Sequence, residues 1–169
     1  MIFEEIEFDL FKVNEELATS GEGLYDLAHC ISADFAMSGG IAVEFNKRWD
    51  MRNRLKTKYT HAFPQFQFTN GLAIAEEVSL NDGNQFMVYN LVTKEQVTHI
   101  PTILSIKNAL VDMRDSMILN NSTKVAMPHI GCGIDQQDWG AVKLVIKDVF
   151  AGTNIEVLAC QMPKNKKTI

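Results

Sequence analysis

The sequence predicts an α/β sandwich built on a mixed β-sheet. Segments with the patterns of strands alternate along the chain with segments of helical periodicity, and an Asn-Asp-Gly turn joins two of the strand-like segments directly. Strands linked through helices pair in parallel, whereas a tight hairpin makes its two strands antiparallel. With 169 residues and a hydrophobic fraction of 46%, the chain is long enough to bury one full core.

The N-terminal third is expected to hold two strands and a helix. Residues 2–8 alternate apolar and acidic side chains, as in a half-buried strand with Ile2 on the buried side. Residues 24–31 form a second strand candidate that runs into a polar residue. Gly39-Gly40 then precedes a helical pattern over 41–49, in which every fourth residue on one face is apolar.

The middle of the chain predicts a hairpin followed by a helix. Residues 72–80 alternate again, and Asn81-Asp82-Gly83-Asn84 is a strong turn signal. Residues 86–92 are apolar on both faces, which indicates a strand that is covered on both sides. Pro101 suits the first turn of a helix, and apolar residues at helical spacing follow over 103–117.

The last third repeats the alternation of strand and helix. Residues 125–128 are expected to be a strand that leads into a glycine-containing loop. A helical pattern begins near Asp138, and Gly152 can terminate it. Residues 155–160 complete the sheet as a final buried strand. No repeat or linker interrupts the chain, so we expect a single domain.

Two pairs of glycines suggest where a ligand binds. In α/β sheets, ligands bind beyond the carboxyl ends of the strands, and Ser32, Lys94 and Gly131 each follow such an end. Glycines at 131 and 133 let backbone N–H groups crowd around an anion, and the helix that follows adds its positive dipole. Gly39-Gly40 also precedes a helix. Two amide cradles suit a pyrophosphate, although plain turn geometry explains each pair equally well.

Lys94 and Asp135 are the candidate catalytic residues. Burial at the end of an apolar strand favours the neutral, nucleophilic form of a lysine amine. A carboxylate on the opposite loop can take a proton or stabilise a developing cation. The alternative is a surface lysine and an aspartate that caps a helix.

Composition and charge exclude several other classes of protein. The net charge of −5 disfavours general nucleic-acid binding, the apolar runs are too short to cross a membrane, and the acidic N-terminus is unlike a secretory signal. Three cysteines fit a reducing compartment, so we expect a cytoplasmic protein, and nothing in the pattern indicates assembly beyond a monomer. The histidine and cysteine spacing predicts no metal site. Neighbouring His29 and Cys30 point to opposite faces of a strand, and Cys132 lacks an orienting partner, which disfavours a cysteine nucleophile.

Four blocks in this order resemble the macro domain family. They are Phe8-Asp9-Leu10-Phe11, Ala28-His29-Cys30-Ile31-Ser32 through Gly40-Ile41-Ala42, Leu91-Val92-Thr93-Lys94, and Met127-Pro128-His129-Ile130-Gly131-Cys132-Gly133-Ile134-Asp135 with Trp139. The resemblance covers about residues 2 to 162. It is to the branch that includes the terminal ADP-ribose protein glycohydrolase and the yeast ADP-ribose-1″-phosphate phosphatase. It implies a three-layer α/β/α sandwich with a mixed central sheet over 1–162, and leaves 163–169 as a short basic tail.

The resemblance also implies roles for individual residues. In the glycohydrolase, the lysine matched by Lys94 attacks the anomeric carbon of the distal ribose, and the aspartate matched by Asp135 assists as base. The implied substrate-binding residues are Asp9, Leu10 and Met162 at the adenine end, Ser32, Gly39, Gly40, Ile41 and Ala42 along the ribose and pyrophosphate, Thr93 beside the lysine, and His129, Ile130, Gly131, Cys132, Gly133 and Ile134 around the pyrophosphate and distal ribose.

The implied function is a hydrolase that recognises ADP-ribose and needs no metal or organic cofactor. It would release ADP-ribose from acyl esters on glutamate or aspartate side chains of modified proteins, or act on O-acetyl-ADP-ribose. Three alternatives stay open: a phosphatase for ADP-ribose-1″-phosphate, a reader that binds ADP-ribose without turnover, and a hydrolase for ADP-ribose attached to a nucleic acid.

The chain departs from the glycohydrolase pattern at three positions. Glu95 stands where the pattern has a second lysine, and a carboxylate there would blunt Lys94 as a nucleophile. His129 replaces an arginine, and so replaces a permanent charge with one expected to titrate near neutral pH. Ser38 replaces a glycine. We therefore expect substrate preference or rate to differ from those of the glycohydrolase.

Overall fold

A computed structural model describes residues 1–18, 23–59 and 71–164. Its centre is a six-stranded sheet in the order β1-β6-β5-β2-β4-β3, in which β3 is antiparallel to β4 and all other neighbours are parallel. This confirms the predicted mixed sheet. The strands are β1 Ile2–Glu7, β2 Asp26–Ser32, β3 Leu72–Ser79, β4 Gln85–Lys94, β5 Lys124–Pro128 and β6 Glu156–Gln161.

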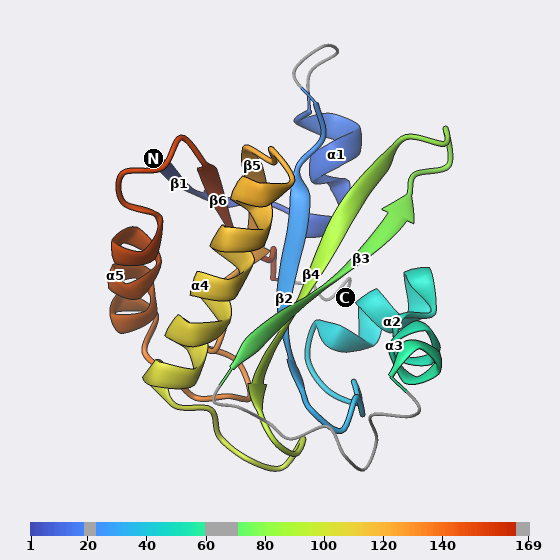
Figure 1. Cartoon of the computed structure of the whole chain (residues 1–169), viewed down its shortest axis with the longest axis vertical. Helices are drawn as coiled ribbons and strands as arrows, with labels where there is room; N and C mark the ends of the chain where they lie inside the picture. Colours follow the sequence, from blue (N-terminus) through green and yellow to red (C-terminus); the bar gives the residue numbers. More distant parts are fainter. Residues whose placement is uncertain (19–22, 60–70, 165–169) are drawn as a thin grey trace.

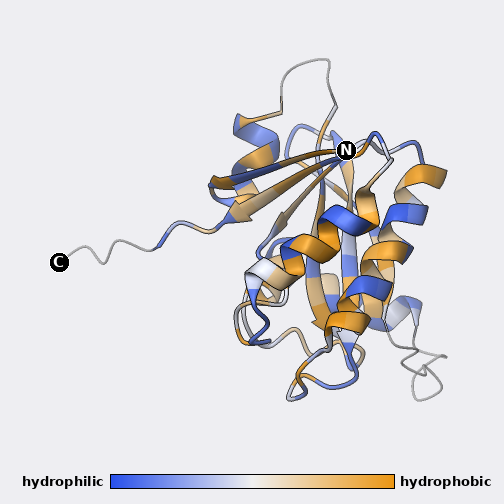
Figure 2. Cartoon of the chain, turned by 90° about the vertical axis from the view of Figure 1, so that its left-hand side faces the viewer, coloured by the Kyte–Doolittle hydropathy of each residue, from blue (hydrophilic) through white to orange (hydrophobic). Residues whose placement is uncertain are grey.

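Helices cover both faces of this sheet, as Figure 1 shows, so the predicted three-layer α/β/α sandwich is confirmed. On one face lie α4 and α5, around which hydrophobic and hydrophilic residues alternate (Figure 2). On the other face lie α2 and α3, with η1 and α1 near one end. The helices are η1 Leu10–Lys12, α1 Val13–Glu16, α2 Ala42–Trp49, α3 Met51–Lys58, α4 Ile103–Leu119 and α5 Trp139–Phe150. Within the predicted basic tail, 165–169 lie outside the described residues.

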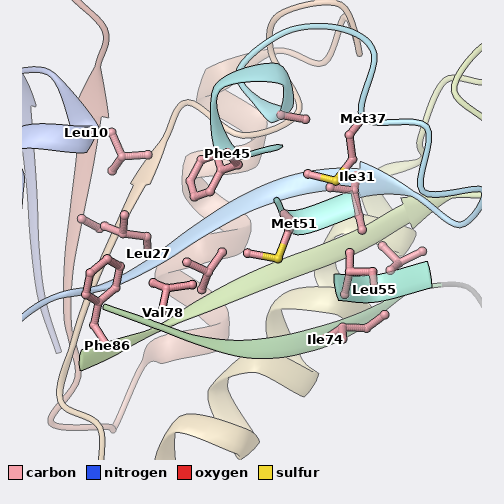
Figure 3. Close-up of a cluster of buried hydrophobic side chains, with 14 of the residues drawn as sticks. Leu10, Leu27, Ile31, Met37, Phe45, Met51, Leu55, Ile74, Val78 and Phe86 are labelled. Carbon is pink, nitrogen blue, oxygen red and sulfur yellow. The ribbon is translucent and has the colours of Figure 1, made fainter. Parts of the chain in front are cut away.

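The core between the sheet and α2 and α3 is shown in Figure 3. Side chains from the two helices enclose apolar residues that alternate along β2, β3 and β4. Phe45 of α2, and Met51 and Leu55 of α3, are fully buried there. This packing holds α2 against the sheet and so fixes the turn that precedes the helix. The labelled members of the cluster are Leu10, Leu27, Ile31, Met37, Phe45, Met51, Leu55, Ile74, Val78 and Phe86.

Two local expectations are wrong. Ile2 is 59% exposed, and Phe3 instead packs toward the core beneath α4 and α5, because β1 is an edge strand whose first residues are not covered on the α2 side. Pro101 is not in the first turn of α4, because Thr102 caps that helix. The Thr102 hydroxyl accepts from the Ser105 N–H at 3.0 Å, and the Ser105 hydroxyl accepts from the Thr102 N–H at 3.1 Å.

The carboxyl ends of the central strands meet at one edge of the sheet. Ser32 and Lys94 are the last residues of β2 and β4 rather than the first residues beyond them, because both strands extend slightly further than the pattern predicted. They pair with each other across a bulge at Ile31 and Ser32. The ends of β5 and β6 lie beside them, with Pro128 paired to Cys160. Four strand ends therefore surround one region.

Candidate active site

A cavity of about 390 Å³ opens at this edge of the sheet. Its floor is formed by the ends of β2, β4, β5 and β6, and its walls by the turn before α2 and the glycine loop after β5. A cavity of this size accommodates an organic ligand. The lining residues are Cys30, Ile31 and Ser32, residues 37–42, Lys94 and Val97, residues 128–135, and Cys160, Gln161 and Met162.

Lys94 and Asp135 meet in this cavity. The Lys94 Nζ lies 2.6 Å from the Asp135 Oδ1, and the two side chains are only 7% and 10% exposed. Strand β4 supplies the amine, and the loop after β5 supplies the carboxylate from the far side of β2. Because both charges are desolvated, each depends on the other for compensation, and a substrate that separates them meets a free amine donor and a free carboxylate acceptor.

The alternative explanation of these two residues is wrong. Lys94 is not a surface side chain, and Asp138 rather than Asp135 caps α5 by accepting from the Ala141 N–H at 3.0 Å. Asp135 is thus left to face Lys94. Glu95, which was expected to blunt the lysine, is exposed, whereas Lys94 is buried against Asp135.

The two glycine turns face each other across the cavity. The Ile134 side chain, 59% exposed, reaches over the first turn, and a Cβ added at Gly39 would lie 3.1 Å from its Cδ1. Gly131 has a φ of +72°, and a Cβ there would lie 2.8 Å from the Ile106 Cδ1. Gly133 has neither constraint, since a Cβ there would meet no described atom within 4 Å. The backbone at Gly133 is therefore open toward whatever occupies the cavity.

Two comparisons with known proteins identify the family of this chain. The chain is 34% identical over 131 residues to human ADP-ribose glycohydrolase OARD1, an alignment that covers 78% of each protein. The fold is similar to that of the macrodomain of Mycobacterium tuberculosis DarG, with a TM-score of 0.77 at 20% identity over 96% of this chain and 99% of that one. The chain belongs to the macro domain family.

A further solved structure has the same fold. This macro domain superposes on Thermosipho africanus DarTG in complex with ADP-ribose with a TM-score of 0.73 at 16% identity, over 99% of this chain and 43% of that one. At this level of identity the likeness shows the fold alone. No family model matches the chain.

Most of the predicted site residues come together in this macro domain. Those that line the cavity are Ser32, Gly39, Gly40, Ile41, Ala42, Lys94, His129, Ile130, Gly131, Cys132, Gly133, Ile134, Asp135 and Met162. Their binding roles stay predictions. Val97, Cys160 and Gln161 line the same cavity and were not predicted as site residues. Cys160 and Gln161 end β6, so the rule that ligands bind at the carboxyl ends of strands could have identified them.

Three predicted residues do not line the cavity. Leu10 is fully buried in the core, Thr93 is 1% exposed, and the Asp9 carboxylate accepts from the Phe11 N–H at 3.0 Å, which caps η1. Two of them nevertheless lie close to one end of the cavity. The Leu10 N–H contacts the Met162 Sδ at 3.5 Å, and the charge of Asp9 adds to the effect of burial in raising the pKa of the Cys160 thiol to about 12.

The cysteines around the cavity are held as thiols. Burial, followed by the charge of Asp135, raises the pKa of Cys30 to about 12. Burial is also the main reason that the pKa of Cys132 is raised to about 11, and its Sγ lies 3.2 Å from the Ile130 carbonyl oxygen. Since the thiolate is the reactive form, neither cysteine is suited to act as a nucleophile near neutral pH.

The surroundings of His129 disfavour its charged form. Its ring stacks on Trp139 with centroids 4.0 Å apart, and its Nε2 lies 3.8 Å from a Glu5 oxygen. Burial lowers its pKa, which outweighs the attraction of Glu5. Glu5 is itself bound by Trp139 Nε1 at 2.7 Å and Lys143 Nζ at 2.8 Å. The imidazole is therefore neutral near pH 7 and belongs to a contact between the loop, β1 and α5.

Neither a metal centre nor a membrane-spanning helix is found in the described parts of the chain. Over residues 1–18, 23–59 and 71–164, no three His, Cys, Asp or Glu side chains converge as metal ligands would. Every helix in those ranges is too short or too polar to cross a bilayer.

Proposed function

We propose that this protein is a hydrolase that releases ADP-ribose from acyl esters on glutamate or aspartate side chains, or from O-acetyl-ADP-ribose. The observation that carries the proposal is the buried Lys94–Asp135 pair, 2.6 Å apart, at the bottom of a cavity walled by two glycine turns. Its similarity to a protein named ADP-ribose glycohydrolase supports the substrate class.

The cavity suits a ligand with a pyrophosphate at its centre. The turns at Gly39-Gly40 and 131–134 both line the cavity, and Ile134 of the second turn reaches Gly39 and Gly40 of the first. Backbone N–H groups of such turns bind anions without requiring a basic side chain. This arrangement is compatible with the net charge of −5, because the ligand is held by amides rather than by surface lysines.

The proposed reaction uses the amine and the carboxylate in turn. Asp135 takes a proton from the Lys94 ammonium, and the free amine attacks C1″ of the distal ribose. A C1″–N bond forms while the C1″–O bond to the acyl group breaks, and the electron pair leaves with the side-chain carboxylate. Water then adds at C1″ and displaces the Lys94 amine, which regains its proton. The products are ADP-ribose and an unmodified carboxylic acid.

A panel of substrates tests this proposal. The protein is incubated with glutamate-linked ADP-ribosyl protein, O-acetyl-ADP-ribose and ADP-ribose-1″-phosphate, and the products are identified by mass. In ¹⁸O-labelled water, attack at C1″ leaves the freed glutamate without solvent oxygen, whereas hydrolysis at the acyl carbon places ¹⁸O in the glutamate. The expected result is release of ADP-ribose with an unlabelled glutamate. A labelled glutamate contradicts the role given to Lys94.

Asp135→Asn is the matched variant for the role of the base. Its amide keeps the size of the carboxylate and still accepts from Lys94, but it cannot take a proton. We expect turnover to fall by about 10²- to 10⁴-fold, while the Kd for ADP-ribose changes by less than about fivefold. Asp138→Asn is the control, because asparagine caps a helix as well as aspartate does. Equal turnover in both variants would remove Asp135 from the mechanism.

The remaining outcomes of the panel identify other functions. Turnover confined to ADP-ribose-1″-phosphate, with release of inorganic phosphate, indicates a phosphatase. Tight binding of ADP-ribose in calorimetry without turnover of any substrate indicates a reader. Adding an ADP-ribosylated oligonucleotide to the panel tests the nucleic-acid-linked alternative, and preference for it over the glutamate ester would replace the proposed substrate.

A further inference from the structure

Asp34 connects the turn that follows β2 to the turn that follows β4, next to the end of the strand that carries Lys94. One of its oxygens, Oδ1, accepts from the Ser32 hydroxyl and from the Ala36 N–H at 3.0 Å. The other, Oδ2, accepts from the Val97 N–H at 3.1 Å. Val97 lies three residues after Lys94 and lines the cavity. A single carboxylate thus joins the turn that follows β2 to the turn that follows β4.

The segment that Asp34 holds has an unusual backbone. Phe35 and Met37, neither of them glycine, have φ values of +53° and +48°, in the left-handed region that disfavours side chains. Phe35 is fully buried and Met37 is 5% exposed, so packing fixes both. Such conformations persist where the surroundings over-determine them, and the bonds to Asp34 from both sides of Phe35 supply part of that restraint.

A second bond joins the same two segments at the catalytic lysine. The Ala33 N–H donates to the Lys94 carbonyl oxygen at 2.8 Å, next to the bulge where Ser32 pairs with Lys94. The backbone that leaves Lys94 is therefore held at two points, by Ala33 at the Lys94 carbonyl and by Asp34 at Val97. Asp34 itself does not line the cavity.

We propose that Asp34 is a positioning residue for Lys94: by clamping the Val97 N–H to the turn after β2, it holds the end of β4 where the lysine amine meets Asp135. The hydrogen bonds keep Asp34 ionised, since burial raises its pKa but the bonds from Ser32, Ala36 and Val97 outweigh burial and lower it. An ionised carboxylate accepts on both oxygens, which this clamp requires. The kinetic consequence rests on the proposed hydrolase function, and the placement of the amine does not.

Asp34→Asn breaks the clamp without changing its volume. The asparagine amide has one acceptor oxygen and one donor nitrogen, so it cannot accept from the Val97 N–H and from the Ser32 and Ala36 side together. We expect kcat to fall by about 10- to 100-fold while the Kd for ADP-ribose changes by less than about threefold. Val97→Pro removes the donor of the same bond and should lower kcat likewise, which keeps the test decisive if one variant does not fold.

Asp26→Asn is the matched control, because Asp26 begins β2 and Asp34 lies just after the end of that strand. Asp26 is buried and also accepts from a backbone N–H, that of Met87 at 2.9 Å, and from a serine hydroxyl, that of Ser122. Its replacement should disturb stability by a similar amount and leave kcat unchanged. If Asp26→Asn and Asp34→Asn lower kcat equally, or if Asp34→Asn leaves kcat unchanged, Asp34 has no positioning role.

A readout that needs no turnover separates this proposal from the proposed function. In protein carrying ¹⁵N-labelled lysine, the ammonium signal of Lys94 reports its bond to Asp135. We expect Asp34→Asn to shift or abolish that signal and Asp26→Asn to preserve it. If the wild-type protein hydrolyses none of the substrates, the proposed function fails while this signal still decides the role of Asp34. An ammonium signal identical in wild type and Asp34→Asn would overturn the inference.

Discussion

Gly131 and Gly133 occupy the same loop for different physical reasons. Gly131 has a left-handed backbone, and the Ile106 side chain fills the space where a Cβ would be. The fold itself therefore requires glycine at that position. At Gly133 the described protein leaves the Cβ position open, and φ is not left-handed. Nothing in the described fold demands glycine there, and the proposed function gives a reason for it, because a bound pyrophosphate would need the open space.

Alanine at each of these positions should give opposite results. Gly133→Ala is expected to fold like the wild type and to weaken ADP-ribose binding by about tenfold or more, because the methyl group occupies the space of the ligand. Gly131→Ala should lower the free energy of unfolding by about 1–2 kcal/mol or more, from backbone strain and the contact with Ile106. Thermal unfolding and calorimetry measure the two effects. Unchanged affinity in Gly133→Ala would contradict a pyrophosphate at this loop.

At the scale of residues, the sequence predicted the pair at the centre of the site better than its surroundings. Lys94 and Asp135 follow strands whose apolar patterns are clear, and parallel strands end at one edge. The partners of His129 could not be predicted in this way. Its contact with Glu5 depends on β1 lying beyond β6, and this order of strands is a property of the folded sheet that local periodicity does not encode.

At the scale of elements, the glycine loop is tied to the start of α4. The Gln137 N–H donates to the Gly131 carbonyl oxygen at 2.7 Å, which closes the loop. The Gln137 Nε2 donates to the Pro101 carbonyl oxygen at 2.6 Å, just before the Thr102 cap. One side chain therefore fixes the loop relative to a 17-residue helix. The hydrogen bond from Gln137 to Pro101 therefore helps to set the conformation of the glycine loop before a ligand binds.

Removing the Gln137 side chain should loosen the loop more than the fold. Gln137→Ala keeps the backbone bond to Gly131 but loses the bond to Pro101, which contributes about 1 kcal/mol. We expect the affinity for ADP-ribose to fall by about three- to tenfold. Without the bond to Pro101, part of the binding free energy is used to order the loop. Calorimetry measures this change. Gln136→Ala, at an exposed neighbouring side chain, is the control, and equal losses in both variants would exclude the link to α4 as the cause.

Helices with a clear apolar period, including the eight-residue α2, were predicted well, whereas α3 was not predicted. The periods of α4 and α5 extend over three or more turns and identify both helices. The eight residues of α3 bury only Met51 and Leu55 and are otherwise polar, so they carry almost no periodic signal. The left-handed Asp50, which divides α2 from α3, likewise has no marker such as glycine or proline. These elements form because the sheet offers an apolar face to cover.

At the scale of the whole molecule, a buried histidine ties stability to pH. His29 is fully buried, stacks on Phe45 and donates from Nε2 to the Asn90 Oδ1 at 2.7 Å. Its Nδ1 has no hydrogen-bond partner among the described residues. Burial lowers its pKa from 6.5 to about 4, against the opposing effect of the bond to Asn90. The folded protein thus holds the neutral form, and protonation favours the unfolded chain.

The free energy of unfolding should fall as the pH falls through this window. Above pH 6.5 His29 is neutral in both states and contributes no pH dependence. Between pH 6.5 and 4, His29 binds a proton in the unfolded state but not in the folded state. The free energy of unfolding therefore falls, by about 3 kcal/mol in total for this group. Below pH 4 its contribution is constant. Urea unfolding at several pH values, with His29 followed by NMR, measures the effect. A histidine signal that titrates near 6.5 in the folded protein would contradict it.

The burial of the Lys94–Asp135 pair affects how exposed the Lys94 amine is to reactive metabolites. Reducing sugars and dicarbonyl compounds damage proteins by condensing with uncharged lysine amines. The Lys94 Nζ lies 2.6 Å from the Asp135 carboxylate, and the lysine side chain is only 7% exposed. Under the proposed mechanism, the amine that attacks the sugar is therefore shielded from glycation until a bound substrate separates it from Asp135.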